Sequence, residues 1–257
     1  MISKDNKLVK KAQKLKQKKY RESENLFIAE GIRFVECAIE NNSLEYILYS
    51  SKLYSTSGYE RVLDSGLDTY EIEESVLESI CDTVNPQGVI GVCRKSLYEV
   101  EDALGNLVAI IDGVQDPGNM GTIIRTCDAA GVSGIVILKG TVDIYNPKVL
   151  RSTMGSIFHM PIVHIDSLLS IKSRLDEKNY NILATSLEAK LSLYDYDFSN
   201  NTAFILGNEA NGVSSESFSL ATDLIIIPME GSAESLNVGV ANGVIVYEAL
   251  RQKISRG

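Results

Sequence analysis

Two short apolar runs in the C-terminal quarter of this 257-residue chain each end in a polar turn. The run at 204–206 leads into a turn at 207–213, and the run at 224–227 leads into a longer turn at 228–237. Both turns are rich in glycine, asparagine, serine and glutamate. Glycine lets a backbone approach a ligand closely, and open α/β sheets bind ligands where a strand gives way to a turn and a helix. The pattern therefore predicts a ligand site built from the two turns.

Ordinary helix caps explain the same residues without a ligand, because Ser214 and Ser235 are suitable N-caps for the helices that follow. A third turn of this kind, at 115–119, follows another apolar run at 107–114, and there Asn119 is the candidate cap. Three such turns, each after a strand pattern, favour a shared ligand site over three unrelated caps.

In order and spacing, the three turns resemble the three sequence motifs of the SpoU (TrmH) family of RNA 2'-O-ribose methyltransferases, within the SPOUT superfamily. The first motif is Asn119-x-Gly121-x-x-x-Arg125. The second is Leu206-Gly207-Asn208-Glu209-x-x-Gly212. The third is Ile227-Pro228-Met229, followed by Ser235-Leu236-Asn237-Val238. The resemblance implies S-adenosylmethionine-dependent methylation of a ribose 2'-hydroxyl in RNA.

The same resemblance assigns residues to the cofactor, S-adenosylmethionine. Gly207, Ile227 and Leu236 match the family positions that bind it, the glycine through close backbone approach and the other two by flanking the adenine. Neighbouring residues are expected to line the same pocket: Leu206, Asn208, Glu209, Gly212, Pro228, Met229 and Ser235.

For the hydroxyl, the resemblance points to Arg125, with Asn119, Ser235 and Asn237 beside it. Arginine is a poor base because its pKa exceeds about 12. We therefore expect Arg125 to orient the RNA phosphate and the hydroxyl, and whether it also takes the proton stays open. Glu209 is the alternative base, or else a bridge between the motif turns.

Apolar runs alternate with helical patterns from 107 onwards, as in a parallel sheet covered by helices on both faces. We predict a three-layer α/β methyltransferase domain at 104–257 with a mostly parallel sheet, and the resemblance adds a trefoil knot. In the last predicted helix, 236–253, Gly239 and Gly243 each cost about 1 kcal/mol relative to alanine, which close helix packing would offset. The resemblance implies that this helix also forms a homodimer interface.

A smaller α/β domain is predicted at 1–98, including the N-terminal arm, with a polar linker within 96–106. Its segment 27–40 resembles the ribosomal-protein-like substrate-binding domain found ahead of many SpoU catalytic domains. That extra domain favours ribosomal RNA over transfer RNA as substrate. The alternatives are a tRNA ribose methyltransferase and a non-catalytic RNA-binding protein of the same fold, and the intact motif residues disfavour the second.

Charge is unevenly distributed along the chain, whose net charge is −9. Residues 1–21 hold nine lysines or arginines and one aspartate, a net of +8, so the remainder carries −17. Such an arm either contacts RNA or is a solvated tail, and the resemblance favours RNA. Lys148 and Arg151, in a further segment that resembles the family, are candidates for phosphate contacts or for a solvated helix face.

Other classes of protein have no support in the sequence. The cysteines (Cys37, Cys81, Cys93 and Cys127) form no C-x-x-C pair and the two histidines have no cysteine at zinc-ligand spacing, so we expect free thiols, a reducing cytoplasm and no metal. No apolar run approaches the roughly 20 residues that span a membrane. The first strand of the predicted catalytic domain lacks the G-x-G-x-x-G of a dinucleotide-binding oxidoreductase.

Overall fold

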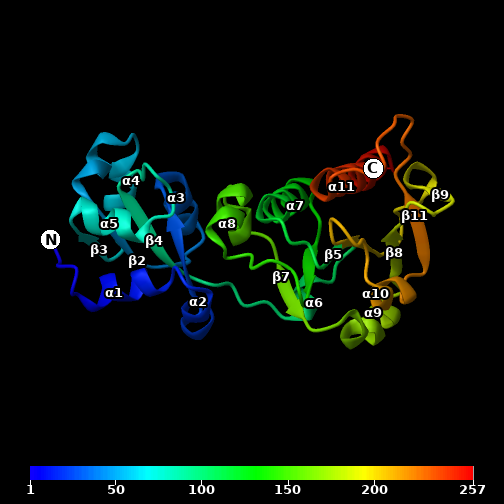
Figure 1. Cartoon of the computed structure of the whole chain (residues 1–257), viewed down its shortest axis with the longest axis horizontal. Helices are drawn as coiled ribbons and strands as arrows, with labels where there is room; N and C mark the ends of the chain where they lie inside the picture. The colour runs from blue at the N-terminus through cyan, green and yellow to red at the C-terminus, as the bar shows by residue number, and fades with distance from the viewer. Residues whose placement is uncertain (257) are drawn as a thin grey trace. The chain divides into compact units, whose positions relative to one another are not determined.

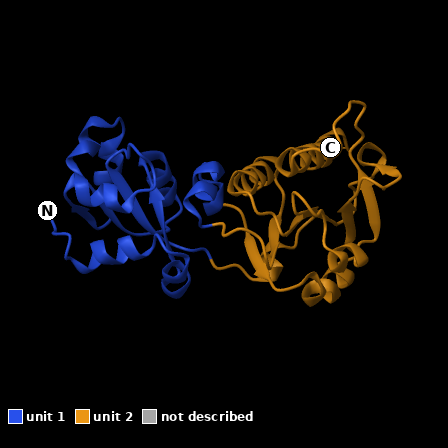
Figure 2. Ribbon diagram, in the orientation of Figure 1, with its two compact units in different colours: residues 1–96, 145–158 blue, residues 97–144, 159–257 orange. Residues whose placement is uncertain are grey.

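The structure, a computed structural model, describes residues 1–256 and divides into two compact units (Figure 2). One unit comprises Met1–Ser96 together with Tyr145–Phe158. The other comprises Leu97–Ile144 and the chain from His159 onwards. The segment Tyr145–Phe158 therefore belongs to the first unit, although the chain on either side of it belongs to the second. The domain limits predicted from the sequence, 1–98 and 104–257, stay a prediction.

The first unit is built on a four-stranded sheet in the order β1-β4-β2-β3. β4 runs antiparallel to β1 and β2, and β3 pairs with β2 in parallel. The elements are α1 (Lys7–Lys14), α2 (Lys18–Glu24), β1 (Leu26–Glu30), α3 (Ile32–Glu40), β2 (Leu44–Tyr49), η1 (Ser51–Ser55), α4 (Tyr59–Leu63), β3 (Thr69–Glu71), α5 (Glu74–Ile80) and β4 (Val89–Arg94).

The basic arm is part of this unit and not a tail. Val9, Ala12 and Leu15 are almost completely buried, and they share one apolar cluster with residues of β2, α5 and β4. The buried Arg21 guanidinium donates to the carbonyls of Leu15 and Lys16, at 2.9 and 2.8 Å, and so caps the end of α1. The solvated-tail interpretation of the arm is therefore wrong.

Helix α8 (Pro147–Thr153) also lies in the first unit. Asn146 caps it, its side chain accepting from the N–H of Lys148 at 2.9 Å, with proline in the first turn. Arg151 pairs with Asp82 at 2.7 Å, so it is not a lone cation on a solvated face. The helix ends at Met154, whose φ is +52°, and a 3-10 turn, η2 (Ser156–Phe158), follows.

The second unit holds a seven-stranded sheet in the order β7-β6-β5-β10-β8-β11-β9, with every pair parallel. Its strands are β5 (Leu107–Asp112), β6 (Gly134–Leu138), β7 (Ile162–Ile165), β8 (Asn181–Thr185), β9 (Leu191–Ser192), β10 (Thr202–Gly207) and β11 (Asp223–Ile226). Its helices are α6 (Val100–Ala103), α7 (Pro117–Ala130), η3 (Leu168–Ile171), α9 (Lys172–Glu177), η4 (Leu193–Asp195), α10 (Ser215–Ser219) and α11 (Val238–Arg256).

Helices cover both faces of this sheet, α7 and α11 on one and α6, α9 and α10 on the other (Figure 1). This arrangement confirms the predicted α/β class with a mostly parallel sheet, while the trefoil knot stays a prediction. Among residues 1–256, none of the helices has both the length and the apolar character needed to cross a membrane.

Helices α7 and α11 pack closely where α11 carries its glycines. A Cβ on Gly239 would lie 3.3 Å from the Thr122 methyl, and one on Gly243 would lie 3.8 Å from that of Thr126. In the same helix pair, the buried Cys127 thiol donates to the buried Asn242 side chain, and burial raises the pKa of Cys127 to about 12. The close helix packing expected from the small residues is confirmed.

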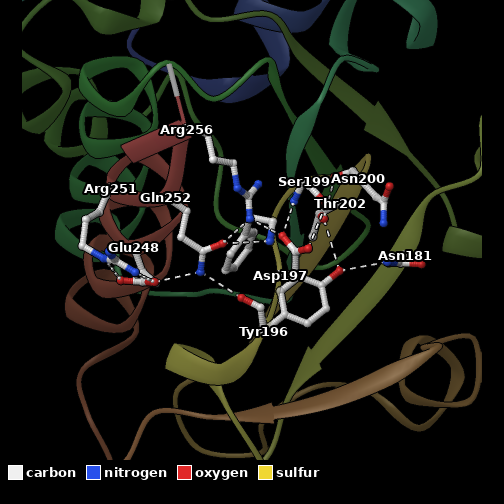
Figure 3. Close-up of polar contacts among 11 residues, drawn as sticks. Asn181, Tyr196, Asp197, Ser199, Asn200, Thr202, Glu248, Arg251, Gln252 and Arg256 are labelled. Atoms are coloured by element: carbon white, nitrogen blue, oxygen red, sulfur yellow. Dashed lines mark hydrogen bonds and ion pairs between the residues drawn. The ribbon is translucent and has the colours of Figure 1, made fainter. Parts of the chain in front are cut away.

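Buried polar side chains fasten the C-terminal end of α11 to the segment at 193–199 (Figure 3). Gln252 accepts from the N–H of Phe198 at 3.0 Å and donates to the carbonyl of Tyr196 at 2.8 Å. It also donates to Glu248, whose carboxylate receives a bidentate pair from Arg251 at 2.8 Å. α11 is thus held at the end opposite to the motif residues that precede it.

Candidate active site

The motif turns meet at the carboxyl edge of the parallel sheet. β5 and β10 are paired neighbours, so the turns after residues 112 and 207 start side by side. The turn after β10 closes on itself, because Asn208 and Gly212 exchange two backbone hydrogen bonds of 2.9 Å. The Asn208 side chain accepts from Ala210 and Asn211 and donates to the carbonyl of Gly113 at 2.8 Å. The second-motif turn is thereby built rigidly against the first.

Gly207 is required by this turn for a reason internal to the protein. A Cβ at position 207 would overlap the backbone of Gly212 and Val213. From the sequence, this glycine is expected to allow close approach of the cofactor. The structure shows that the turn itself passes over the glycine, which leaves no room for any side chain.

A chain of hydrogen bonds joins all three motifs. The Asn237 side chain donates to the Asn119 side-chain oxygen at 2.8 Å, and the Asn119 amide donates to Glu209 at 3.0 Å. Asn119 is available for this role because Asp116, and not Asn119, caps α7: the N–H of Asn119 donates to the Asp116 carboxylate at 2.8 Å. Glu209 also accepts from the backbone N–H groups of Gln115 and Asp116, each at 3.1 Å.

These donors set the ionisation of Glu209. Burial alone would raise its pKa, but the hydrogen bonds from Asn119, Gln115 and Asp116 outweigh burial and lower the pKa below its usual value. Glu209 is therefore a carboxylate of low basicity whose oxygens are occupied by three donors. That geometry favours a bridge between turns over a general base.

Beside this chain of hydrogen bonds lies a cavity of about 410 Å³, a volume within the range of small-molecule binding sites. Most of the residues expected to bind the cofactor line it: Leu206, Gly207, Asn208, Gly212, Ile227, Met229 and Leu236. Glu209, Ser235 and Asn237 line it as well, whereas Pro228 does not. The cavity combines an apolar wall with backbone and amide groups, which suits a ligand that has both an aromatic base and a polar tail.

Sequence reasoning missed part of this wall. Thr185, Ser186 and Leu187, at the end of β8, line the cavity, as do Val238 and Ala241 in the first turns of α11. β8 lies between β10 and β11 in the sheet, so its end must fall between the second and third motif turns. The strand pattern at 181–186 was visible in the sequence, but its place in the sheet was not.

Arg125 stands apart from the cavity. It is exposed on α7, and among residues 1–256 it forms no hydrogen bond or ion pair with another side chain. It lies six residues beyond Asn119, which is about 9 Å along the helix axis. Helical side chains lean towards the N-terminus of their helix, so the guanidinium can reach back over Gly121. The structure brings together four of the predicted site residues at the cavity: Asn119, Glu209, Ser235 and Asn237. Arg125 is left free for a group outside the chain.

Comparison with known proteins identifies the family. The model of the SpoU rRNA Methylase family matches residues 106–247, and that of the MRM3-like substrate binding domain matches residues 6–91. This chain belongs to the SpoU rRNA methylase family. The 23S rRNA (guanosine(2553)-2'-O)-methyltransferase RlmP of Bacillus subtilis is 37% identical over 244 residues, 94% of this chain and 95% of RlmP. The predicted family is confirmed, and with it a methyltransferase that uses S-adenosylmethionine.

Solved SpoU structures resemble the whole chain. AviRb from Streptomyces viridochromogenes, in complex with AdoMet, gives a TM-score of 0.87 at 28% identity, covering 97% of this chain and 99% of AviRb. The TrmH/SpoU tRNA modifying enzyme of A. aeolicus gives a TM-score of 0.52 at 32% identity and covers only 61% of this chain and 79% of its own. The tRNA-modifying relative thus leaves more than a third of this chain unmatched. Among residues 1–256, no group of His, Cys, Asp and Glu side chains could hold a metal ion.

Proposed function

We propose that this SpoU methyltransferase transfers a methyl group from S-adenosylmethionine to a ribose 2'-hydroxyl of 23S ribosomal RNA. The observation that carries the proposal is the cavity at the carboxyl edge of the sheet, whose wall contains residues of the second and third motifs and whose rim is tied to the first motif through Asn119. Ribosomal RNA is favoured over transfer RNA because the matches to rRNA-modifying relatives include the N-terminal unit.

The cavity residues suit S-adenosylmethionine. Ile227 and Leu236 offer apolar surface for the adenine, and the backbone of the turn at 207–212 offers polar groups for the ribose and the amino acid end. When bound, the cofactor supplies an electrophilic methyl group on a sulfonium. The residues of the chain hold that group in place and keep water from it.

Arg125 is the residue that we assign to the RNA. Its guanidinium is exposed and without a partner in the described chain, so it is free to form a bidentate contact with a phosphate and to orient the neighbouring hydroxyl. Asn119, Asn237 and Ser235 form the polar rim of the cofactor cavity, because Asn237 and Ser235 line it and the Asn119 side chain accepts from Asn237. Glu209 acts as the bridge that fixes the rim and takes no proton from the substrate.

Two measurements test this proposal: calorimetry with S-adenosylmethionine and methyl transfer to a 23S rRNA transcript. Arg125→Ala should abolish transfer and leave cofactor affinity nearly unchanged. Arg174→Ala is the matched control, because Arg174 is an exposed arginine of the same unit that pairs with Glu101 at 3.1 Å, and it should behave as wild type. Absence of cofactor binding by the wild-type protein would refute the function, and full activity of Arg125→Ala would refute the role of the arginine.

We also propose that the protein is a cytoplasmic homodimer that associates through α11. Val240, Tyr247 and Ile254 are 52%, 51% and 69% exposed, and their spacing of seven residues places them along one side of the helix. An exposed apolar stripe of this kind suits a twofold interface with a second copy. Light scattering at micromolar concentration should give the mass of a dimer, and a monomer at every concentration would refute the homodimer.

The cysteines support the cytoplasmic location. The four free cysteines, three of them buried, suit a reducing compartment.

A further inference from the structure

The nine basic residues of the N-terminal arm fall into two groups in the folded unit. Three either contact β2 or α5 or are buried. Lys11 pairs with Glu45 at 3.0 Å, the Lys16 ammonium donates to the carbonyl of Ser79 at 2.8 Å, and Arg21 is buried. The other six are exposed, and we call them the lysine face: Lys4, Lys7, Lys10, Lys14, Lys18 and Lys19.

The lysine face is a fixed array. Lys7, Lys10 and Lys14 occupy successive turns on one side of α1, over about 10 Å of helix, while Val9 and Ala12 anchor the other side in the core. The Lys14 ammonium lies 5.6 Å from the centre of the Tyr20 ring, which connects α1 to the lysines of α2. Because the helix is packed, its backbone loses little conformational freedom when these cations meet a partner.

The charge on these lysines is largely uncompensated. Lys10 pairs with Asp5 and Lys18 with Glu22, and in both pairs the two side chains are more than half exposed. Exposed pairs of this kind contribute little and exchange readily for another anion. Residues 22–96 hold five basic and fourteen acidic side chains, a net of −9 against +8 for residues 1–21. A polyanion therefore meets attraction at the lysine face and repulsion from most of the remaining surface, within a screening length of about 8 Å.

We propose that the lysine face docks the phosphate backbone of a double-helical segment of the RNA substrate, a step that rests on the proposed function. Lysine ammonium groups are point charges that suit phosphates and do not distinguish bases. Proteins that bind single strands add exposed aromatic rings on which bases stack. The single aromatic residue of α1 and α2, Tyr20, is covered by Lys14 instead. The contact is therefore sequence-independent and positions the RNA, leaving the choice of nucleotide to other residues.

The test is the salt dependence of RNA binding by the full-length protein. Deleting the arm is unsuitable because Val9, Ala12 and Leu15 belong to the core, so the variant is Lys7→Gln, Lys10→Gln and Lys14→Gln combined. The control removes three cations of the same unit outside α1 and α2: Arg33→Gln, Lys52→Gln and Arg61→Gln. The probes are a 20-base-pair RNA duplex of arbitrary sequence, a single-stranded RNA of the same length and anionic phospholipid vesicles.

With the duplex, we expect the slope of log affinity against log salt to fall by about 2 to 3, because each lost phosphate contact contributes about 0.7 to 0.9. The control should change the slope by less than half of that, and both variants should keep the wild-type melting temperature and cofactor affinity. An unchanged slope, an equal loss in the control, or a loss seen with single strands or vesicles but not with the duplex would overturn the proposal. Failure of the proposed function would appear separately, as absent cofactor binding or absent methyl transfer by the wild-type protein.

Discussion

Replacing Glu209 by glutamine distinguishes a bridge from a base. The Glu209 carboxylate accepts hydrogen bonds from two backbone N–H groups, those of Gln115 and Asp116, and from the Asn119 side chain, at 3.0 to 3.1 Å. Glu209→Gln keeps the size of the side chain but replaces one acceptor oxygen with a donor. At least one of the three bonds is then lost, and an NH₂ group faces an N–H group.

The expected loss follows from those contacts. A net hydrogen bond to a charged group is worth about 1.5 to 3 kcal/mol when buried, and the exposure of this carboxylate reduces that value. One lost bond, together with the unfavourable donor pair, amounts to about 2 kcal/mol. If the bridged arrangement is the one that binds S-adenosylmethionine, the affinity falls by up to about 30-fold.

Calorimetry and single-turnover methyl transfer together give the assay, with Glu230→Gln, an exposed glutamate of the third-motif turn, as the control. A bridge predicts weaker cofactor binding and near-normal transfer once the cofactor is saturating. Unchanged cofactor affinity combined with a thousandfold slower transfer would instead identify Glu209 as the base and refute the reasoning.

The pH dependence follows from the lowered pKa of Glu209. The folded pKa lies below the usual 4.5, so the bridge contributes fully above that value and is lost as the pH falls through the folded pKa. Cofactor affinity should therefore show no change due to Glu209 between about pH 6 and 9.

Three further predictions concern stability and assembly. Gly207→Ala should destabilise the second-motif turn by about 2 kcal/mol or more and weaken cofactor binding, as measured by thermal melting and calorimetry. Gly231→Ala is the control and should have neither effect, because a Cβ there would meet nothing within 4 Å. Gln252→Leu leaves two main-chain groups without partners and should cost about 2 kcal/mol, which a melting temperature at or above that of wild type would contradict. Tyr247→Glu combined with Val240→Glu should convert the dimer to a monomer in light scattering, and a retained dimer mass would exclude this side of α11 as the interface.

Much of the fold could be predicted from the sequence because the second unit consists of buried parallel strands. Continuous apolar runs such as 107–112 are characteristic of strands covered on both faces, and glycine or proline marks their ends. The two-residue strand β9 and the short 3-10 turns could not be predicted, since so few residues carry no periodicity. The packing of α1 was predictable in principle, because Val9 and Ala12 have helical spacing, although lysines dominate the segment around them.

The sequence motifs predict part of the site. The part that depends on the order of the strands in the sheet could not be predicted. Residues of the second and third motifs, apart from Pro228, line the cavity, while the end of β8 enters it only because that strand lies between β10 and β11. The role of Glu209 also depended on the fold, because the backbone N–H groups that lower its pKa come from residues 94 and 93 positions earlier in the chain.

The amide at position 119 has a chemical explanation in these contacts. Its oxygen accepts from Asn237 and its nitrogen donates to Glu209, so the two partners together determine the orientation of the amide. An aspartate there would place a second carboxylate within about hydrogen-bonding distance of Glu209 and would repel it. A leucine would leave both partners unpaired at the rim of the cavity. Asparagine, with a donor and an acceptor on one short side chain, connects an amide donor on one motif to a carboxylate on another, and this is the property that the geometry requires.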